Sequence, residues 1–154
     1  MKIEGTQEVH APRERVFSLL TDHGVLQRCI PGCESLEKID ENAYAVTIKA
    51  GIGAIKGTFK GNVRLEDMRL PEHYRIVVDG KGGPGFVKGS GDFNLEERDG
   101  TTLIKYAGEM QVGGLIAGVG QRMIQAAAKM MASRFFTALE AEFSGTPELR
   151  PAVQ

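Results

Sequence analysis

The chain has 154 residues, 42% hydrophobic and 25% charged, which predicts one soluble globular domain with a full hydrophobic core. Its 19 basic and 20 acidic residues leave no basic excess of the kind that nucleic-acid-binding domains carry. Residues 1–17 lack the apolar core of a secretory signal, and the longest apolar run, 112–119, is too short to cross a bilayer, so we expect a cytoplasmic protein.

The N-terminal region predicts one strand followed by two short helices. Residues 1–9 alternate weakly in polarity, and Pro12 suits the first turn of a helix that continues to Leu20. Residues 22–24 break that helix, and a second short turn over 25–29 ends at the Pro31-Gly32 pair. We therefore expect a strand with two short helices after it.

From residue 44 to residue 112 the hydrophobic period is two, which is typical of half-buried strands. The alternation covers the ranges 44–49, 59–66, 74–80, 87–96 and 104–112, with a hairpin turn signal at 98–100. Short turns join these ranges. The pattern predicts an antiparallel meander that, with the first strand, contains six to seven strands.

After Gly113-Gly114 the period becomes that of a helix. One face of this helix is apolar, and it contains Ile124, Ala127, Ala128, Met131, Phe135, Ala138 and Leu139. The helix is expected to end near residue 144, with residues 145–154 as a tail or the start of a linker. The order of elements predicts an α+β helix-grip domain over residues 1–144, in which the curved sheet wraps around the long C-terminal helix.

The inward-facing rows of the meander contain five glycines. They are Gly61, Gly80, Gly89, Gly91 and Gly108. Glycine inside a strand marks a bend or the close approach of a ligand, and so many on one face would underfill a core that is normally close-packed. Either the glycines only allow the sheet to bend, or the bend also leaves an apolar cavity of the size of a small-molecule site, which is the interpretation we favour.

The same rows contain no Asp, Glu, Lys, Arg or His, so they offer no pair of catalytic carboxylates and no nucleophile with a base. This pattern argues against an enzyme. The polar groups left are the hydroxyls of Tyr44, Tyr74 and Tyr106, which can bond a carbonyl or quinone oxygen or reach solvent. An enzyme of the cyclase or dehydratase kind would need Asp22, His23 or Glu109 inside, and a one-residue slip in the last strand would bring Glu109 inward.

The segment 113–120 is expected to form the first turn of the long helix and the mouth of the cavity. Gly118 and Gly120 would each cost that helix about 1 kcal/mol relative to alanine, which suggests a segment that moves. Leu115, Ile116 and Val119 are its expected apolar lip.

Metal and nucleotide sites are not expected. Cys29 and Cys33 have no second ligand pair, and the three histidines are scattered, so we expect reduced thiols of unassigned role and no metal. The glycine clusters at 51–57 and 80–85 lie between strands and do not open a helix, which argues against a phosphate-binding loop. No cofactor is predicted.

Several short motifs together resemble the carbon monoxide dehydrogenase CoxG family, which belongs to the START-like helix-grip superfamily (SRPBCC). They are Asp22 with the segment 29–34, the segments 51–53 and 56–61, 100–106 with Tyr106, and 113–122 with Gly120 and Arg122. The resemblance covers residues 1–143. It implies a hydrophobic cavity beneath the terminal helix and an accessory role beside molybdenum hydroxylases of the carbon monoxide dehydrogenase type, with quinone handling and peripheral association with the inner face of the membrane.

The leading hypothesis is therefore non-catalytic binding of a hydrophobic small molecule, such as a quinone or a lipid, between the sheet and the long helix. The residues expected to line the site are Phe59, Val63, Ile76, Val78, Gly89, Gly91, Phe93, Tyr106, Met110, Leu115, Met123, Met131 and Phe135. The alternatives are the START-like enzyme described above and a protein adaptor that docks its partner through residues 115–119. The ligand, the partner enzyme and the oligomeric state are left open by the sequence.

Overall fold

The structure, a computed structural model, describes residues 1–144. Seven antiparallel strands form one sheet, in the order β1-β7-β6-β5-β4-β3-β2. The strands are β1 (Lys2–Val9), β2 (Cys33–Asp40), β3 (Ala43–Ile52), β4 (Ile55–Arg69), β5 (His73–Gly82), β6 (Gly85–Arg98) and β7 (Thr101–Gly113). The helices are α1 (Arg13–Leu20), α2 (His23–Cys29), the short 3-10 helix η1 (Leu115–Val119) and α3 (Gln121–Ser144).

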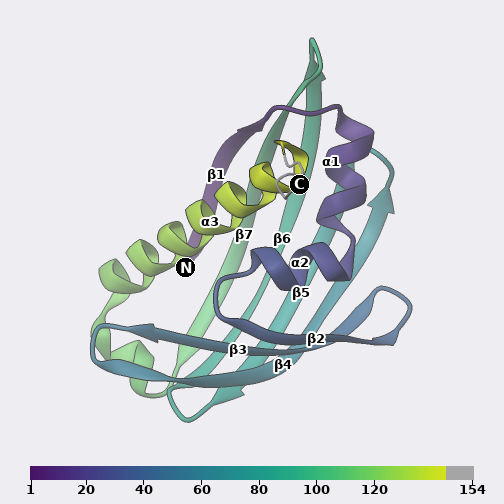
Figure 1. Cartoon of the computed structure of the whole chain (residues 1–154). Coiled ribbons are helices and arrows are strands. Elements are labelled where there is room, and N and C mark those ends of the chain that lie inside the picture. Colours follow the sequence, from purple (N-terminus) through teal and green to yellow (C-terminus); the bar gives the residue numbers. More distant parts are fainter. Residues whose placement is uncertain (145–154) are drawn as a thin grey trace.

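The sheet is strongly curved, and α3 lies along its concave side (Figure 1). Strands β2 to β7 form the predicted meander, and β1 returns to pair with β7, with Gly5 opposite Tyr106. The helix-grip architecture predicted from the order of elements is confirmed.

Strand β2 was not predicted, because its sequence shows no clear hydrophobic periodicity. Only Leu36 of its eight residues is buried, and its pairing with β3 contains two register shifts. An irregular edge strand with one buried side chain has no alternation to detect.

The hydrophobic core fills one end of the molecule. Helices α1 and α2 cover that end (Figure 1), and their buried residues include Phe17, Leu20 and Leu26. Phe17 contacts Tyr74 of the sheet edge-to-face, with ring centroids 5.6 Å apart. Asp22 begins α2, because its Oδ1 accepts hydrogen bonds from the backbone N–H groups of Gly24 (2.9 Å) and Val25 (3.1 Å). The core therefore occupies the end covered by α1 and α2.

The start of the long helix differs from the prediction. Residues 115–119 form the separate 3-10 helix η1, and α3 begins only at Gln121. Gly114 (φ 82°) and Gly120 (φ 95°) bound η1 in a backbone conformation that favours glycine. Gly118 and Gly120 therefore do not penalise α3, since both precede it.

The boundary predicted at residue 144 stays a prediction, and the tail predicted over residues 145–154 lies outside the described residues. Within residues 1–144, no helix is both long and apolar enough to cross a membrane.

Candidate functional site: a two-lobed apolar cavity

A cavity with two lobes lies between the concave face of the sheet and α3. The first, which we call the hairpin lobe, has a volume of about 570 Å³ and extends to Ile52 at the β3–β4 hairpin and to Ile116 of η1. The second, the tyrosine lobe, has a volume of about 390 Å³ and is bordered by Tyr44, Tyr74 and Tyr106. The two lobes share eight lining residues, which are Pro31, Val46, Ile48, Val63, Val78, Met110, Ala128 and Met131.

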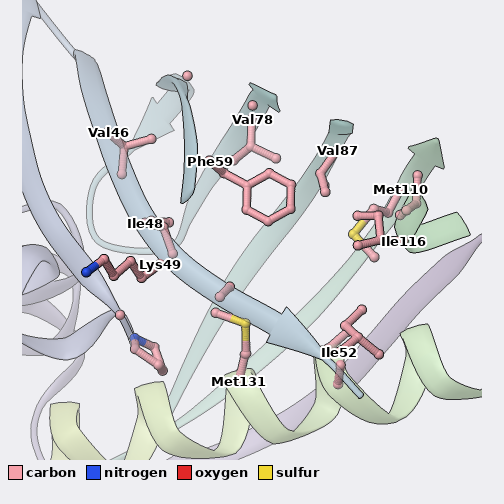
Figure 2. A pocket seen from close by; sticks show the side chains of 18 of the residues that line it. Val46, Ile48, Lys49, Ile52, Phe59, Val78, Val87, Met110, Ile116 and Met131 are labelled. Atoms are coloured by element: carbon pink, nitrogen blue, oxygen red, sulfur yellow. The ribbon is translucent and has the colours of Figure 1, made fainter. Parts of the chain in front are cut away.

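The lining of the hairpin lobe is drawn in Figure 2. Val46 and Ile48 come from β3, Phe59 from β4 and Val78 from β5, and Met131 of α3 lies across the space from them. These strand residues are the inward members of the alternation, so the period-two pattern of the sequence is what places an apolar wall here.

Most of the residues predicted to line the site do border the cavity. They are Phe59, Val63, Ile76, Val78, Gly89, Gly91, Phe93, Tyr106, Met110, Met131 and Phe135. Leu115 and Met123 do not, because their side chains face outward and are 67% and 46% exposed. In the predicted lip it is Ile116 that turns inward, with only 3% of its surface exposed. Its backbone N–H donates to the carbonyl of Pro84 (2.9 Å).

Part of the wall was absent from the predicted set. Val46 and Ile48 belong to an alternation that the sequence shows, and Ala127 and Ala128 lie on the predicted apolar face of α3, so these residues could have been included. Pro31 follows α2, and no periodicity identifies its position at the cavity.

The sequence left two interpretations of the inward glycines: they only allow the sheet to bend, or they also leave a cavity. The structure shows both a close approach of strands and a cavity at these glycines. At Gly61 a Cβ atom would overlap the backbone carbonyl of Asp79, so neighbouring strands approach there too closely for a side chain. Gly89 and Gly91 of β6 lie opposite Val78 and Ile76, and they border the tyrosine lobe. The curved sheet therefore keeps a hollow where side chains would otherwise fill it.

Four ionisable residues of the sheet border the cavity, namely Lys49, Lys60, Asp79 and Glu109. Lys60 and Asp79 directly follow the inward residues Phe59 and Val78, which places their side chains on the outer face of the sheet. Glu109 is paired with Ser90, whose hydroxyl accepts a hydrogen bond from Arg75 on the outer face of the sheet. The register therefore places Glu109 outward. Lys49 borders the hairpin lobe, but its amine points away from it (Figure 2) and lies 3.4 Å from Glu34. Arg134 of α3, an exposed residue, also borders the hairpin lobe.

The other two candidates for an enzyme also have structural roles. Asp22 caps α2, and the ring of His23 stacks on Tyr44 with centroids 5.8 Å apart. His23 is exposed. Neither side chain borders the cavity.

The polar groups of the tyrosine lobe are hydroxyls. Tyr74 is 2% exposed, and within residues 1–144 its hydroxyl has no hydrogen-bond partner. Burial raises the pKa of Tyr74 well above its ordinary value, so the hydroxyl stays protonated. It is therefore a hydrogen-bond donor inside an apolar space.

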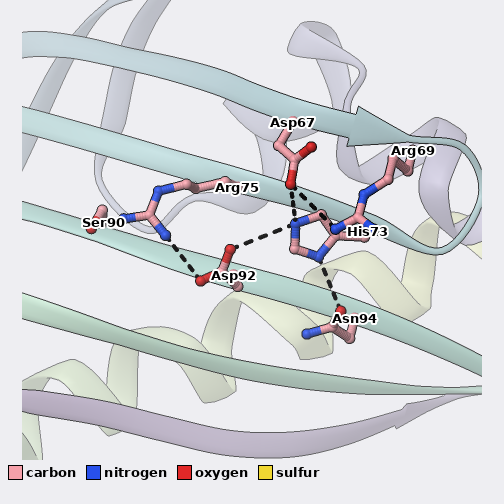
Figure 3. Close-up of polar contacts among 7 residues, drawn as sticks. All are labelled: Asp67, Arg69, His73, Arg75, Ser90, Asp92 and Asn94. Atoms are coloured by element: carbon pink, nitrogen blue, oxygen red, sulfur yellow. Dashed lines mark hydrogen bonds and ion pairs between the residues drawn. The ribbon is translucent and has the colours of Figure 1, made fainter.

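The main polar cluster of the sheet lies on its outer face (Figure 3). His73 is 7% exposed; its Nδ1 lies 3.0 Å from Oδ1 of Asn94 and its Nε2 lies 3.2 Å from Oδ2 of Asp67. Arg75 donates to Asp92 (3.0 Å) beside it. These contacts link β4, β5 and β6 at the end opposite the β3–β4 hairpin, outside both lobes.

The two cysteines are free thiols. Burial raises the pKa of Cys29 to about 11, and burial also raises the pKa of Cys33. Both therefore lack the thiolate character of reactive cysteines. Over the described range 1–144, no three His, Cys, Asp or Glu side chains are grouped as metal ligands.

Comparison with known proteins gives the family. The family model of carbon monoxide dehydrogenase CoxG proteins matches residues 5–144. The chain belongs to the CoxG family. No curated protein has a significant sequence match to it. CoxG proteins are accessory subunits, so the family supports an accessory role.

Solved structures share the fold. A conserved protein from Geobacillus kaustophilus is 37% identical, with a TM-score of 0.90, and the match covers 94% of this chain and 95% of that one. A START superfamily protein from Mycobacterium smegmatis is 18% identical, with a TM-score of 0.67 over 92% of this chain and 95% of that one. Ara h 8.0201 is 19% identical, with a TM-score of 0.70 over 94% and 99% of the two chains. The fold is therefore START-like.

Proposed function

We propose that this CoxG-family protein binds a hydrophobic small molecule in the two-lobed cavity and does not transform it. The observation that carries the proposal is an interior space lined by aliphatic, aromatic and methionine side chains, while ionisable side chains of the sheet point outward. Apolar pockets of this volume with a few polar groups are typical of small-molecule sites. Catalysis by acid–base or nucleophilic chemistry would need a titratable group at the ligand. Of the three predicted for it, Asp22 and His23 border neither lobe, and Glu109 borders the tyrosine lobe but points outward in the register.

A quinone or a lipid fits this space best among common cellular molecules, because the wall is predominantly apolar and includes three tyrosines as hydroxyl donors. Membership of the CoxG family supports a partner of the carbon monoxide dehydrogenase type. In this proposal the protein holds the ligand as an accessory to that enzyme.

The end of the molecule that carries the hairpin lobe supports peripheral contact with an anionic membrane. The basic residues nearest this end are Lys49, Lys56, Lys60, Lys81, Lys88, Arg122 and Lys129, while residues 43–63, 80–91 and 110–133 contain no Asp or Glu. The β3–β4 turn, the β5–β6 turn and η1 meet at this end, where Leu115, Met123 and Met130 are exposed. Basic and apolar side chains together are the composition that binds anionic lipid surfaces.

A matched pair of substitutions on α3 tests the ligand-binding proposal. Ala128 borders both lobes, whereas Ala126 lies on the same helix and is exposed. Ala128→Trp should fill the space where the lobes meet and weaken the uptake of a fluorescent apolar probe at least tenfold, while Ala126→Trp should leave uptake unchanged. Equal uptake by the two folded variants would contradict the proposal.

A further inference from the structure

The two lobes differ in their polar atoms. The hairpin lobe is lined by residues such as Val87, Val112 and Ile124, and it has no tyrosine. The tyrosine lobe has three, Tyr44, Tyr74 and Tyr106, and it lies toward α1 and α2, with Leu20 and Leu26 in its wall. The hydroxyl donors of the cavity are thus concentrated in the lobe that is farther from the β3–β4 hairpin.

Tyr74 is held rigidly in this lobe. Its ring makes edge-to-face contacts with Phe17 (centroids 5.6 Å apart) and Phe93 (4.9 Å). Strand β5 fixes its backbone opposite Phe93 of β6. Tyr74 borders the tyrosine lobe, and no side chain or backbone atom within residues 1–144 makes a hydrogen bond to its hydroxyl. A ligand oxygen in the lobe would.

Tyr106 carries a second hydroxyl of the tyrosine lobe, and its ring contacts Phe93, as the ring of Tyr74 does. The ring of Tyr106 lies 6.0 Å from that of Phe93 and 5.6 Å from that of Phe136. Gly5 of β1 makes room for the hydroxyl, because a Cβ atom at Gly5 would lie only 2.5 Å from it. This hydroxyl also has no hydrogen-bond partner in the part of the chain that the structure describes.

The linings of the two lobes also differ in their charged residues. The lining of the tyrosine lobe includes no Lys, Arg or His, and its one acidic residue, Glu109, points outward in the register. A carboxylate buried there would have no counter-charge and would lose its hydration, which is strongly unfavourable. A neutral carbonyl oxygen, in contrast, needs only a hydrogen-bond donor.

We infer that the ligand is uncharged, carries a carbonyl-type oxygen at one end of an apolar chain, and binds with that oxygen in the tyrosine lobe and the chain in the hairpin lobe. This inference rests on the proposed function and adds the charge class and the orientation of the ligand. An anionic amphiphile such as a fatty acid is selected against, although cationic residues surround the other end of the cavity.

Three C16 probes of matched length test the charge class: hexadecan-2-one, hexadecane and hexadecanoic acid at pH 8, each in competition with a fluorescent apolar probe. Wild-type protein should bind the ketone most tightly. Tyr74→Phe and Tyr106→Phe should each weaken ketone binding by about fivefold to tenfold, the effect of one lost hydrogen bond, and leave hexadecane binding unchanged. Because the Tyr74 hydroxyl is unpartnered in the protein, Tyr74→Phe should not lower the melting temperature, unlike the loss of a structural hydrogen bond.

Chain length tests the orientation. Val87 borders only the hairpin lobe, so Val87→Trp should weaken the binding of hexadecan-2-one and leave that of the shorter octan-2-one unchanged. Tighter binding of the acid, equal binding of ketone and hydrocarbon, or unchanged ketone binding in both tyrosine variants would overturn the inference and leave the proposed function standing. Failure of all three C16 probes to bind would overturn the proposed function, and this inference with it.

Discussion

Nδ1 of His10 lies 2.7 Å from a carboxylate oxygen of Glu140, which joins the chain just after β1 to the C-terminal part of α3. On the other side of the helix, Arg28 of α2 makes two hydrogen bonds to the carboxylate of Glu142, at 2.8 and 3.1 Å. The C-terminal part of α3 is thus connected to both neighbouring elements by charged pairs.

The His10 contact predicts a raised pKa for this histidine. The hydrogen bond to Glu140 is the largest cause, and the negative charges of Glu140 and Glu8 add to it. A raised folded-state pKa means that the contact stabilises the fold fully below the unfolded-state value near 6.5, and that this contribution disappears as the pH rises through the folded-state pKa. An NMR titration should show His10 titrating above 6.5, and Glu140→Gln should return it toward 6.5.

Glu8→Gln is the control for that titration. Glu8 lies farther away, 3.7 Å from Nε2 of His10, and its influence is the smallest. Its replacement should move the pKa of His10 less than Glu140→Gln does. An equal shift in both variants would show that the contact with Glu140 does not form in solution.

The uneven anchoring of α3 predicts uneven hydrogen exchange. Leu139 is fully buried and Phe136 is 5% exposed, whereas η1 is bounded by two glycines with positive φ. Backbone amides of residues 115–123 should therefore exchange faster than those of residues 132–140, as expected of a segment that opens to admit a ligand. Hydrogen exchange with mass spectrometry measures this. Equal protection would mean that η1 does not act as the entrance.

The His73 cluster predicts a loss of stability without a loss of binding. His73→Ala removes contacts to Asn94 and Asp67 at a buried position and should lower the free energy of unfolding by about 1–3 kcal/mol. Uptake of the apolar probe per folded molecule should not change, because the cluster lies on the outer face of the sheet. A selective loss of uptake with unchanged stability would assign the cluster a role in the site.

The basic end predicts charge-dependent contact with vesicles. Lys56 and Lys81 lie beside the β3–β4 and β5–β6 turns. Changing both to Glu should abolish co-sedimentation with vesicles that contain 30% phosphatidylglycerol. The matched control is Lys38→Glu with Lys105→Glu, on β2 and β7, which should retain binding. Retention by the first variant would place the membrane contact elsewhere.

The sequence predicted correctly which strand residues face inward, but it did not predict where helix α3 begins. Strict alternation in 74–80 and 87–96 gave the correct inward rows, because a side chain's face in a strand depends only on parity. The pairing of Val78 with Gly89 confirms this. Strand β2 was indistinct because one buried residue, Leu36, defines no period.

Leu115 and Met123 were predicted to line the cavity but do not border it, for a different reason. Helical periodicity states which residues share a face, but the start of a helix and its position above a sheet depend on tertiary packing. Because α3 begins at Gln121, Met123 lies in its first turn, near Gly53 of the β3–β4 turn and outside the cavity. Met131, two turns later on the same helix, does lie over the cavity.

The most direct test of ligand binding is the content of the purified protein itself. Native mass spectrometry, followed by solvent extraction and identification of the released compound, should find one neutral lipophilic molecule per chain in wild-type protein and less of it in Ala128→Trp. A wild-type protein that is folded, free of any lipophile and unable to take up apolar probes would contradict the account.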